Sequence, residues 1–444
     1  MHPRRLPRAD RSSLYHFILV LAFLAVGCDT VPFTYVDNGA RRPRDNSREL
    51  PPVQSPVYEE SFVNSDFESA QPATLPISGQ IEIMGTIDGR SDIDLYALGP
   101  AVAGDQIIID VVGKNGLNTV AALFDEFGDL IDANNDRSFY AGNYDPYIAQ
   151  VVRRDTDNLF VGVAVSTARH FASSTGQYDS GEYTIKVSRR PDQAVRPPAQ
   201  QIVWLDFAGG DQVQIALEPI EVMRPFSAES ISSRFAGKTS YITDMVVDLL
   251  KRDLAPFNVV VLDGRYDARP TGPYSKLYFG NYNAAYLGLA DSVDTGNLYT
   301  TQEAIIFAED LQLFEGLQPS AEAVALALSN IAAHELGHLL GLEHTSESLD
   351  VMSTAATARQ ILEIDETYRR SRLELAVFPI GWQSGTDLLT LNVGLNPNGT
   401  SARWRMQDWM PADAVGIDPA LGDIAISMCG KCAHAPATDA DAHH

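Results

Sequence analysis

The sequence has few cysteines and few basic residues for its length. Only three of its 444 residues are cysteine, so a network of disulfides cannot hold the fold together. Lysine and arginine number 33 against 58 aspartates and glutamates, and the formal charge of -25 argues against a nucleic-acid partner because it repels phosphate. Charged residues make up only 20% of the chain and hydrophobic ones 45%, which excludes a long disordered protein and fits two or three globular domains.

Long apolar runs are also scarce, and the one that stands out lies near the N-terminus. The basic stretch MHPRRLPRADR precedes an apolar run from Leu14 to Gly27, which is too short to span a membrane and fits a secretory signal. Cys28 follows directly, and LAVGC resembles a bacterial lipobox, whose cysteine is acylated. We therefore expect export, either to the cell envelope through a lipid on Cys28, or to the outside after plain cleavage, or with the segment retained as an anchor.

Shifts in composition divide the chain into segments. Residues 1–28 form the signal, and residues 29–71, rich in Pro, Asn, Ser and charge, predict a flexible tether. Residues 72–190 alternate short β-prone stretches with Gly, Asn and Asp, which predicts an antiparallel β-sandwich. Residues 191–200 are a proline-rich linker, residues 201–384 alternate strand and helix patterns typical of a mixed α/β (α+β) domain, and residues 385–444 are an extension with a mobile tail.

The predicted sandwich is dense in loop carboxylates. These are Asp88, Asp92, Asp94, Asp125, Asp129, Asp132 and Asp136. Aspartate favours turns, but the same side chains could also bind Ca²⁺, a hard ion that requires several oxygens. The succession from GTIDGRSDIDLYAL to GEYTIKV resembles the bacterial pre-peptidase C-terminal domain, which implies a small sandwich of the kind found beside secreted proteases.

The other two cysteines, Cys429 and Cys432, lie in the sequence MCGKCAH near the C-terminus. A closed zinc site would need two further ligands and only His434 is near, so a small disulfide is the simpler interpretation after export. His443 and His444 end the chain in a stretch without an apolar period, where we expect a mobile tail that could bind stray metal.

The stretch SAEAVALALSNIAAHELGHLLGLEH predicts a buried helix that carries polar residues. Ser320 is a plausible N-cap, and apolar side chains occupy almost every direction around the axis. His334 and His338 lie one turn apart on the same face, with Glu335 beside them. Burying two imidazoles and a carboxylate is costly unless they are paired or bind a metal, so the pattern favours a metal site.

Gly341 can adopt the positive φ that ends a helix, so the chain can turn and bring His344 back to the other two histidines. Three neutral imidazoles leave one tetrahedral position of Zn²⁺ open for a water, as in a catalytic site. Glu335, beside the metal but not bound to it, would take a proton from that water and pass it to the leaving amine. The residues therefore predict zinc-assisted hydrolysis of an amide.

The same residues match the metzincin signature, H-E-x-x-H-x-x-G-x-x-H followed by a methionine turn. The signature reads His334, Glu335, His338, Gly341 and His344, with Met352 eight residues beyond the last histidine. The resemblance covers about residues 200–380 and implies a metzincin-type peptidase with zinc on the three histidines, catalysis by Glu335 and Met352 beneath the metal. It also implies a polypeptide substrate that adds itself to the edge strand YLGLADSV, and a later helix over TAATARQILEIDETYRRSRLE.

The chain departs from the patterns of the individual metzincin subfamilies. Thr345 follows the last histidine where matrixins carry a serine, which makes matrixins the nearest in residue size. Thr354 stands where astacins and serralysins have a tyrosine that assists the oxyanion, so no such helper is indicated. No matrixin-type cysteine precedes the domain to cap the zinc, since Cys28 is the only N-terminal cysteine. The small residues of STAATARQ permit a roomy substrate pocket.

The sequence therefore predicts a secreted or lipid-anchored zinc metalloendopeptidase whose sandwich orients the substrate. The alternative is a surface lipoprotein that retains zinc but acts by adhesion through the sandwich. Glu335 argues against this alternative, because a scaffold has no evident need for a carboxylate at that position. The oligomeric state stays open.

Overall fold

The computed structural model describes the chain from residue 55 to residue 398, apart from residues 62, 139–141, 168–178, 217 and 284. The chain divides into two units after Val53, and all described residues belong to the second, compact unit. Several predictions fall outside the described residues: those for the signal, most of the tether, Cys28, Cys429, Cys432, His434, His443 and His444. Among the helices that the structure describes, none is long and apolar enough to cross a membrane.

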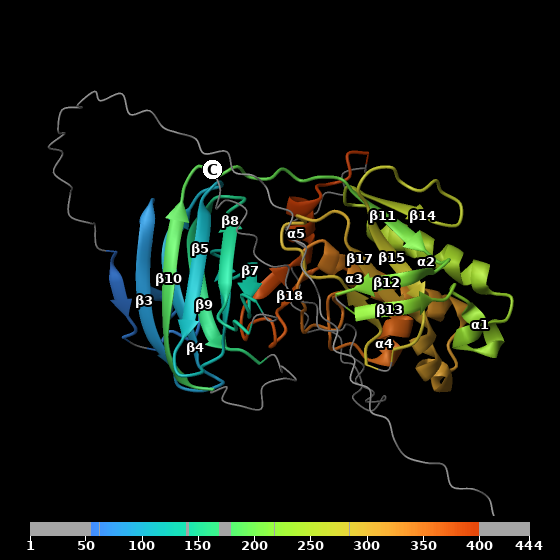
Figure 1. Cartoon of the computed structure of the whole chain (residues 1–444), viewed down its shortest axis with the longest axis horizontal. Coiled ribbons are helices and arrows are strands. Elements are labelled where there is room, and N and C mark those ends of the chain that lie inside the picture. Colours follow the sequence, from blue (N-terminus) through green and yellow to red (C-terminus); the bar gives the residue numbers. More distant parts are fainter. Residues whose placement is uncertain are drawn as a thin grey trace, which may run out of the picture. The chain divides into compact units, whose positions relative to one another are not determined.

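The N-terminal part is a β-sandwich of two five-stranded sheets (Figure 1). The first sheet has the order β1 (Val57–Glu59), β3 (Gly79–Ile87), β10 (Gly181–Arg190), β5 (Gln106–Gly113) and β8 (Tyr147–Val151). The second has the order β2 (Gln71–Pro72), β4 (Ile93–Ala101), β9 (Thr156–Val165), β6 (Thr119–Phe124) and β7 (Leu130–Asn134). Alternate residues of each strand point inward and form one apolar core, as the period-2 pattern predicts.

The sandwich begins earlier than predicted. The expected tether ran to residue 71, but β1 pairs in parallel with β3 and β2 pairs in parallel with β4. Both additions are too short and too polar to be recognised from sequence, and they form because the open edges of β3 and β4 offer unpaired backbone groups. The prediction of a purely antiparallel sandwich is therefore correct for all but these two edge pairs.

The second sheet is buried on both faces. Strand β6 has no exposed residue, and its outward side chains Val120, Ala122 and Phe124 belong to a second apolar cluster together with Leu373 and Phe378. Those last two residues come from the far C-terminal part of the described chain, which packs on the sheet where solvent would otherwise be. An ordinary sandwich would alternate apolar and polar residues here, and near-continuous burial is the physical reason for the apolar sequence TVAALF.

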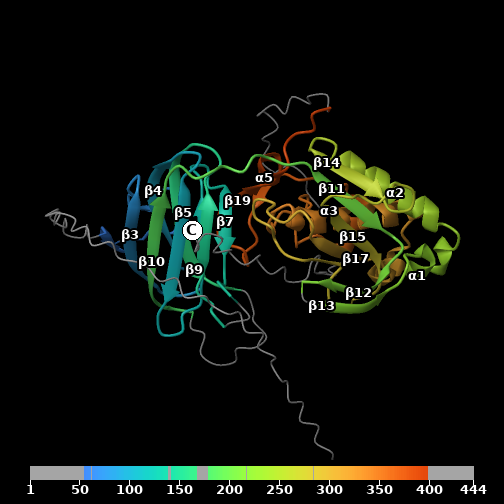
Figure 2. The same cartoon turned by 45° about the horizontal axis from the view of Figure 1, so that its top comes forward.

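The second part is a mixed sheet covered by helices. Its strand order is β14 (Val259–Asp263), β11 (Gln201–Asp206), β15 (Ser275–Gly280), β17 (Glu303–Phe307) and β16 (Gly288–Ala290). The first four strands are parallel, and β16 pairs antiparallel with β17 at the edge, which confirms the predicted edge strand. Helices α2 (Thr239–Asp253) and α3 (Ala321–Leu339) supply much of the core on one face (Figure 2). A hairpin of β12 (Gly210–Ile215) and β13 (Glu218–Met223) packs through its apolar residues on the other face.

Shorter elements complete the second part. They are α1 (Ala228–Ile231), η2 (Ser233–Phe235), η3 (Ala308–Leu317), α4 (Ala358–Glu363), β18 (Arg370–Arg372), β19 (Trp382–Ser384) and α5 (Gly385–Asn392). The predicted fold class, a β-sandwich followed by a mixed α/β domain, is confirmed. The predicted linker at residues 191–200 contains neither helix nor strand.

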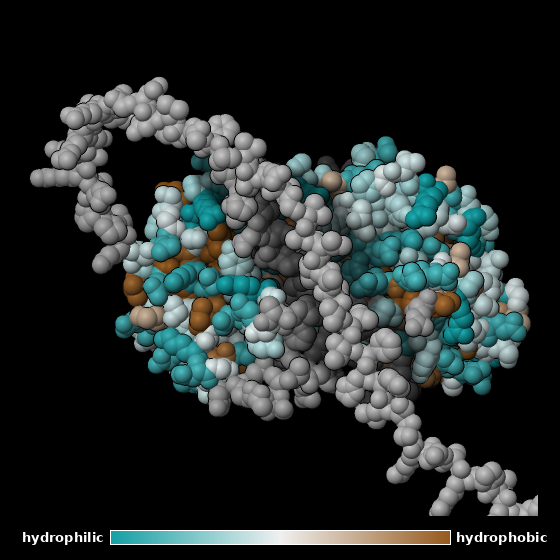
Figure 3. Space-filling model, in the orientation of Figure 1, coloured by the Kyte–Doolittle hydropathy of each residue, from teal (hydrophilic) through white to brown (hydrophobic). Residues whose placement is uncertain are grey.

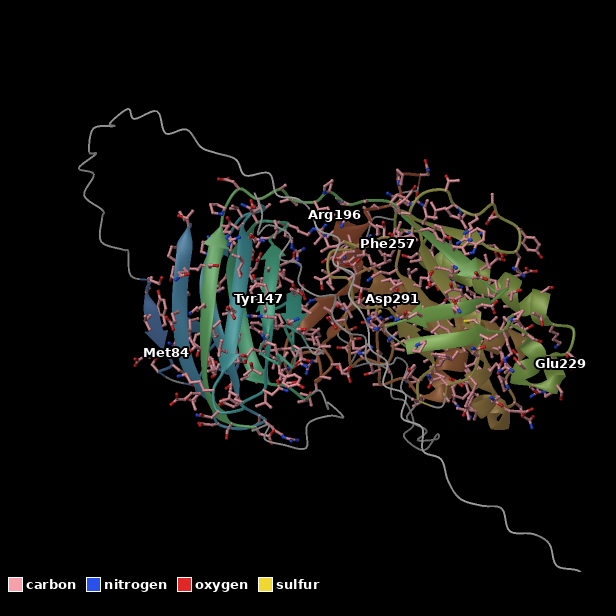
Figure 4. All side chains as sticks on the ribbon, in the orientation of Figure 1. Met84, Tyr147, Arg196, Glu229, Phe257 and Asp291 are labelled. Carbon is pink, nitrogen blue, oxygen red and sulfur yellow. The ribbon has the colours of Figure 1, made fainter. Side chains whose placement is uncertain are left out.

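The predicted helix over residues 354–374 is wrong in its extent. Helix α4 starts at a capping box on Thr357 and ends at Glu363, because Ile364 turns to an extended conformation. Asn330 of α3 donates its side-chain amide to the carbonyls of Ile361 and Ile364, and so satisfies the end of the helix. The chain beyond then places Tyr368 in the core, where it lies edge-on to Phe257, a residue labelled in Figure 4. Tertiary contacts thus override the helical period.

The predicted boundary at residue 384 is also wrong, because α5 belongs to the core of the second part. Leu389 and Val393 are buried in the same apolar cluster as helices α2 and α3. The visible surface of the described residues is mostly hydrophilic, with scattered apolar spots (Figure 3), as the excess of carboxylates leads one to expect.

Candidate metal centre

Helix α3 carries the first two histidines and the glutamate of the motif. Ser320 caps its start by accepting a hydrogen bond from the N–H of Ala323, as predicted. His334, Glu335 and His338 are each 0% exposed. The helix thus places three polar side chains in the interior, where each requires a partner.

The helix ends in a Schellman motif at Gly341. The N–H of Gly341 donates to the carbonyl of His338 and the N–H of Leu342 to that of Gly337, both at 2.9 Å. Gly341 has φ 90°, and a side chain there would lie 2.6 Å from the carbonyl oxygen of Asp294. Both facts require glycine, and the resulting turn directs the chain back toward His344.

The three histidines converge, as the sequence predicted. The Nε2 atom of His338 lies 3.2 Å from that of His334 and 3.0 Å from that of His344. Ligands at about 2.0–2.1 Å around a tetrahedral zinc lie about 3.3 Å apart, so the spacing fits one such ion. Among the described residues, these three side chains form the group whose donor atoms could hold a metal together.

The hydrogen bonds of His334 and His338 determine which of their ring nitrogens can bind a cation. The Nδ1 atoms of His334 and His338 lie 2.7 and 2.8 Å from the carbonyl oxygens of Val351 and Leu342, which only accept, so each Nδ1 carries the proton. Burial, followed by the two neighbouring histidines, holds the pKa of His334 well below its usual value and keeps the ring neutral. Neutral Nε2 atoms at this distance repel one another unless a cation lies between them. The donor set therefore fits zinc.

The third histidine has a carboxylate partner that the sequence did not reveal. The Nδ1 atom of His344 lies 3.3 Å from Oε2 of Glu374. Burial acts to raise the pKa of Glu374, but hydrogen bonds from His344 and Thr354 outweigh it and hold that pKa below its usual range. A carboxylate behind a histidine orients the ring and increases its basicity toward a metal. Glu374 stands thirty residues beyond the motif, and no periodic signal marks it.

Glu335 lies against the edge strand. A methyl group on Gly288 of β16 would overlap the carboxylate of Glu335, so glycine at this position is what gives the side chain its room. The arrangement brings the carboxylate of α3 directly beside the backbone of the edge strand β16. Gly288 was not singled out from the sequence, because a glycine in a short strand gives no signal of what lies above it.

Met352 packs against the motif helix beside Gly337, and its predicted place beneath the metal stays a prediction. Its side chain is 0% exposed, and a methyl group on Gly337 would overlap the Met352 sulfur. The Met352 carbonyl accepts from the N–H of Thr345 at 2.9 Å, which ties the methionine turn to the residue after His344. The Thr345 hydroxyl in turn donates to Asp350 at 3.0 Å, and burial raises the pKa of Asp350 to about 6.

Four of the seven sandwich carboxylates, those of Asp92, Asp94, Asp125 and Asp129, accept hydrogen bonds or form ion pairs in this structure. Asp88 donates its N–H to Asp92, and Asp125 accepts from two turn amides. Asp94 accepts from the hydroxyl of Tyr183 at 2.6 Å, and Asp129 pairs with an arginine at 2.7 Å. These contacts agree with turn chemistry, and Ca²⁺ binding stays a prediction.

The sequence is similar to a known peptidase family around the centre. The family model of Matrixin matches residues 286–367, which hold β16, the motif helix and the methionine turn. The match covers less than a fifth of the chain, and it confirms the resemblance to metzincins on the segment that carries the signature. Together with the three converging histidines it supports a zinc metallopeptidase. The comparison with curated protein sequences gave no significant match.

Three solved structures show weak similarity to parts of the chain. Archaemetzincin from Methanopyrus kandleri is 15% identical over 44% of this chain and 96% of its own, with a TM-score of 0.25. The pre-peptidase C-terminal domain of collagenase from Bacillus anthracis is 17% identical over 27% of this chain and 94% of its own, with a TM-score of 0.18. PliG of Aeromonas hydrophila, a periplasmic inhibitor of g-type lysozyme, is 13% identical over 31% and 100%, with a TM-score of 0.20.

Proposed function

We propose that the protein is an exported zinc metalloendopeptidase that cleaves peptide bonds in polypeptides. The observation that carries the proposal is the convergence of three Nε2 atoms at 3.0 and 3.2 Å, two of them from helix α3 and one from the segment after it, beside a glutamate that lies against the edge strand. The ligands are His334, His338 and His344, and Glu335 is the catalytic base. The matrixin match over the same residues supports this assignment.

The zinc ion, when bound, would polarise the scissile carbonyl and acidify a water molecule beside it. Glu335 accepts the proton of that water and donates it to the leaving amine, so one carboxylate serves as base and then as acid. Its complete burial removes competing solvent, and the contact with Gly288 restricts the position of the carboxylate. Glu374 contacts Nδ1 of His344, so the Nε2 of His344, 3.0 Å from that of His338, would be the atom that holds the ion.

The substrate is expected to bind as an extended strand along β16. Among the described strands, β16 pairs only with β17, so the backbone groups of its outer edge are open to a peptide. Pairing there places a scissile bond beside Glu335, because Gly288 is both a member of the strand and the contact of the carboxylate. Main-chain pairing favours cleavage within a chain, hence an endopeptidase.

The substitution Glu335→Gln tests the mechanism. It removes the proton acceptor but keeps the shape, so cleavage of casein or a labelled peptide should fall by about 10²–10⁴-fold while one zinc per chain is retained. Glu363→Gln, a change at an exposed ion pair on α4, is the matched control and should leave cleavage unchanged. Undiminished cleavage by the Glu335→Gln protein would remove the mechanism and leave adhesion as the better account.

Export and attachment rest on the N-terminal sequence alone. The apolar run and Cys28 support secretion with a lipid on the cysteine, and hence a place in the cell envelope. Labelled palmitate should be incorporated into the protein but not into a Cys28→Ala variant, and the variant should leave the membrane fraction. Incorporation into both proteins, or into neither, would contradict lipidation at Cys28.

A further inference from the structure

His344 is the one predicted ligand that helix α3 does not place. The segment from Leu340 to His344 is held by side chains from the C-terminal part of the described chain. The amide of Asn392 donates to the Leu340 carbonyl at 2.7 Å. Gln383 accepts from the N–H of Glu343 at 2.7 Å and donates to its carbonyl at 2.8 Å. With Glu374 behind the His344 ring, three side chains fix the backbone and the orientation of the third ligand.

Each of these three side chains lies on a segment that packs against the β-sandwich. Asn392 accepts a hydrogen bond from Arg153 of the sandwich. Gln383 follows Trp382, whose N–H donates to the carbonyl of Gly128 at 3.0 Å. A small cavity of about 60 Å³ is lined by sandwich residues on one side and by Gly341 and Asn392 on the other, so the sandwich reaches the turn itself.

The segment around Glu374 is the most deeply docked of the three. Leu373, Val377 and Phe378 belong to the apolar cluster on the outer face of the second sheet. Phe378 is 0% exposed and lies edge-on to Phe124, with ring centroids 5.5 Å apart. The carboxylate that orients His344 is thus carried by a segment that Leu373, Val377 and Phe378 anchor in this cluster.

The fit on both sides of this contact depends on glycine. A side chain on Gly162 of β9 would lie 2.6 Å from the ring of Phe378, and one on Gly381 would lie 2.5 Å from the ring of Phe124. Arg370 also forms a largely buried ion pair with Asp129 of the sandwich at 2.7 Å. Close complementarity and a buried ion pair indicate a specific contact rather than a loose tether.

We propose that the β-sandwich is a positioning element of the metal centre, which holds His344 through Glu374, Gln383 and Asn392. The proposal rests on the zinc site of the proposed function. The sandwich is then part of the peptidase and not only a module for substrate, and loosening its contact weakens zinc by releasing the third ligand. Residues that hydrogen-bond to a metal ligand commonly contribute about 10–100-fold to metal affinity.

The substitution Gly162→Ala in the full chain tests the proposal from a position outside the metal centre. The added methyl group displaces Phe378, so the dissociation constant for zinc, measured by competition with a chelator, should rise by about tenfold. The visible spectrum of the cobalt-substituted protein should change, and amide exchange should accelerate across residues 373–384. Gly89→Ala is the matched control, since Gly89 has no atom within 4 Å of the added methyl group and should keep the wild-type values.

A double-mutant cycle separates positioning from general destabilisation. In a His344→Ala background the third ligand is already lost, so Gly162→Ala should weaken zinc no further. Phe378→Asp serves as a second disruption, because an aspartate cannot stay buried among aromatic rings without a partner. If both variants fold, judged by circular dichroism, and keep wild-type zinc affinity and cobalt spectrum, the proposal is overturned, as it also is by additive effects in the cycle. Failure of the wild-type chain to bind zinc would instead refute the proposed function.

Discussion

The two halves of the metal centre are built in different ways. His334 and His338 lie one turn apart on a 19-residue helix, and their spacing follows from the helical period alone. His344 lies on an irregular segment whose position depends on Gly341, Gln383 and Glu374. The first half is local structure inside a core, whereas the second half is tertiary structure.

This difference between the two halves predicts whether a substitution changes stability, metal affinity or both. A change in the helical half alters a rigid element whose neighbours are all buried, so it acts on stability and metal together. A change in the second half acts on the placement of one ligand, so it acts on metal affinity with less effect on folding. The following substitutions probe this difference.

Loss of a ligand should have the largest effect. His338→Ala removes the nitrogen that lies 3.2 Å from that of His334 and 3.0 Å from that of His344, and zinc affinity should fall by more than about 100-fold, beyond the range typical of supporting residues. The melting temperature should fall as well, because truncating a fully buried side chain leaves a cavity in the core. Chelator competition and thermal melting measure both quantities. If the His338→Ala protein still bound one zinc per chain at nanomolar free zinc, His338 would not be a zinc ligand.

Gly337→Ala should have the next largest effect. It should lower both the free energy of unfolding and the affinity for zinc. The methyl group overlaps the Met352 sulfur, so overpacking should cost about 1–3 kcal/mol in the free energy of unfolding despite the gain in helix propensity. Denaturant unfolding measures this cost. The double variant with Met352→Ala should recover part of it, and a more stable Gly337→Ala protein would show that the methionine does not lie there.

Gln383→Ala should weaken zinc with a smaller effect on the fold. The variant loses the two hydrogen bonds between the Gln383 side chain and the backbone of Glu343, the residue before His344. The zinc dissociation constant should therefore rise by about tenfold. Gln312→Ala, an exposed change in η3, is the control. Equal affinities in the two variants would mean that His344 does not depend on Gln383, and the contrast between the halves would be lost.

The smallest expected effect is on the pH dependence of stability. It arises from two buried carboxylates, Glu366 and Asp350. Burial, with Asp350 as a second cause, raises the pKa of Glu366 from 4.5 to about 8. The folded state thus binds a proton that the unfolded state has released, so the free energy of unfolding falls as the pH rises from about 4.5 to about 8. Glu366→Gln removes this loss, and its gain in melting temperature should be larger at pH 8 than at pH 5. The same gain at both values would show that Glu366 does not titrate in this range.

The sequence predicted the helical half almost completely. The cap at Ser320, the two histidines, Glu335 and the turn at Gly341 all follow from residue types at fixed short spacings. The edge strand could be predicted as well, because YLGLADSV precedes another strand pattern and the resemblance to metzincins placed it.

The supporting half could not be predicted in the same way. Glu374, Gln383 and Asn392 lie thirty to fifty residues beyond His344, and nothing in a period of 2 or 3.6 marks a side chain that contacts a distant backbone. The predicted helix over residues 354–374 and the boundary at residue 384 were wrong for a related reason. Both segments take their conformation from the cores against which they pack.

X-ray absorption at the zinc edge of the purified full chain tests the central claim most directly. The account predicts one zinc with three histidine nitrogens at about 2.0–2.1 Å and one further light atom from solvent. Outer-shell scattering counts the imidazoles, and the His344→Ala protein should show one fewer. Sulfur at about 2.3 Å, which would implicate Cys429 and Cys432, or an imidazole count unchanged by His344→Ala, would contradict it.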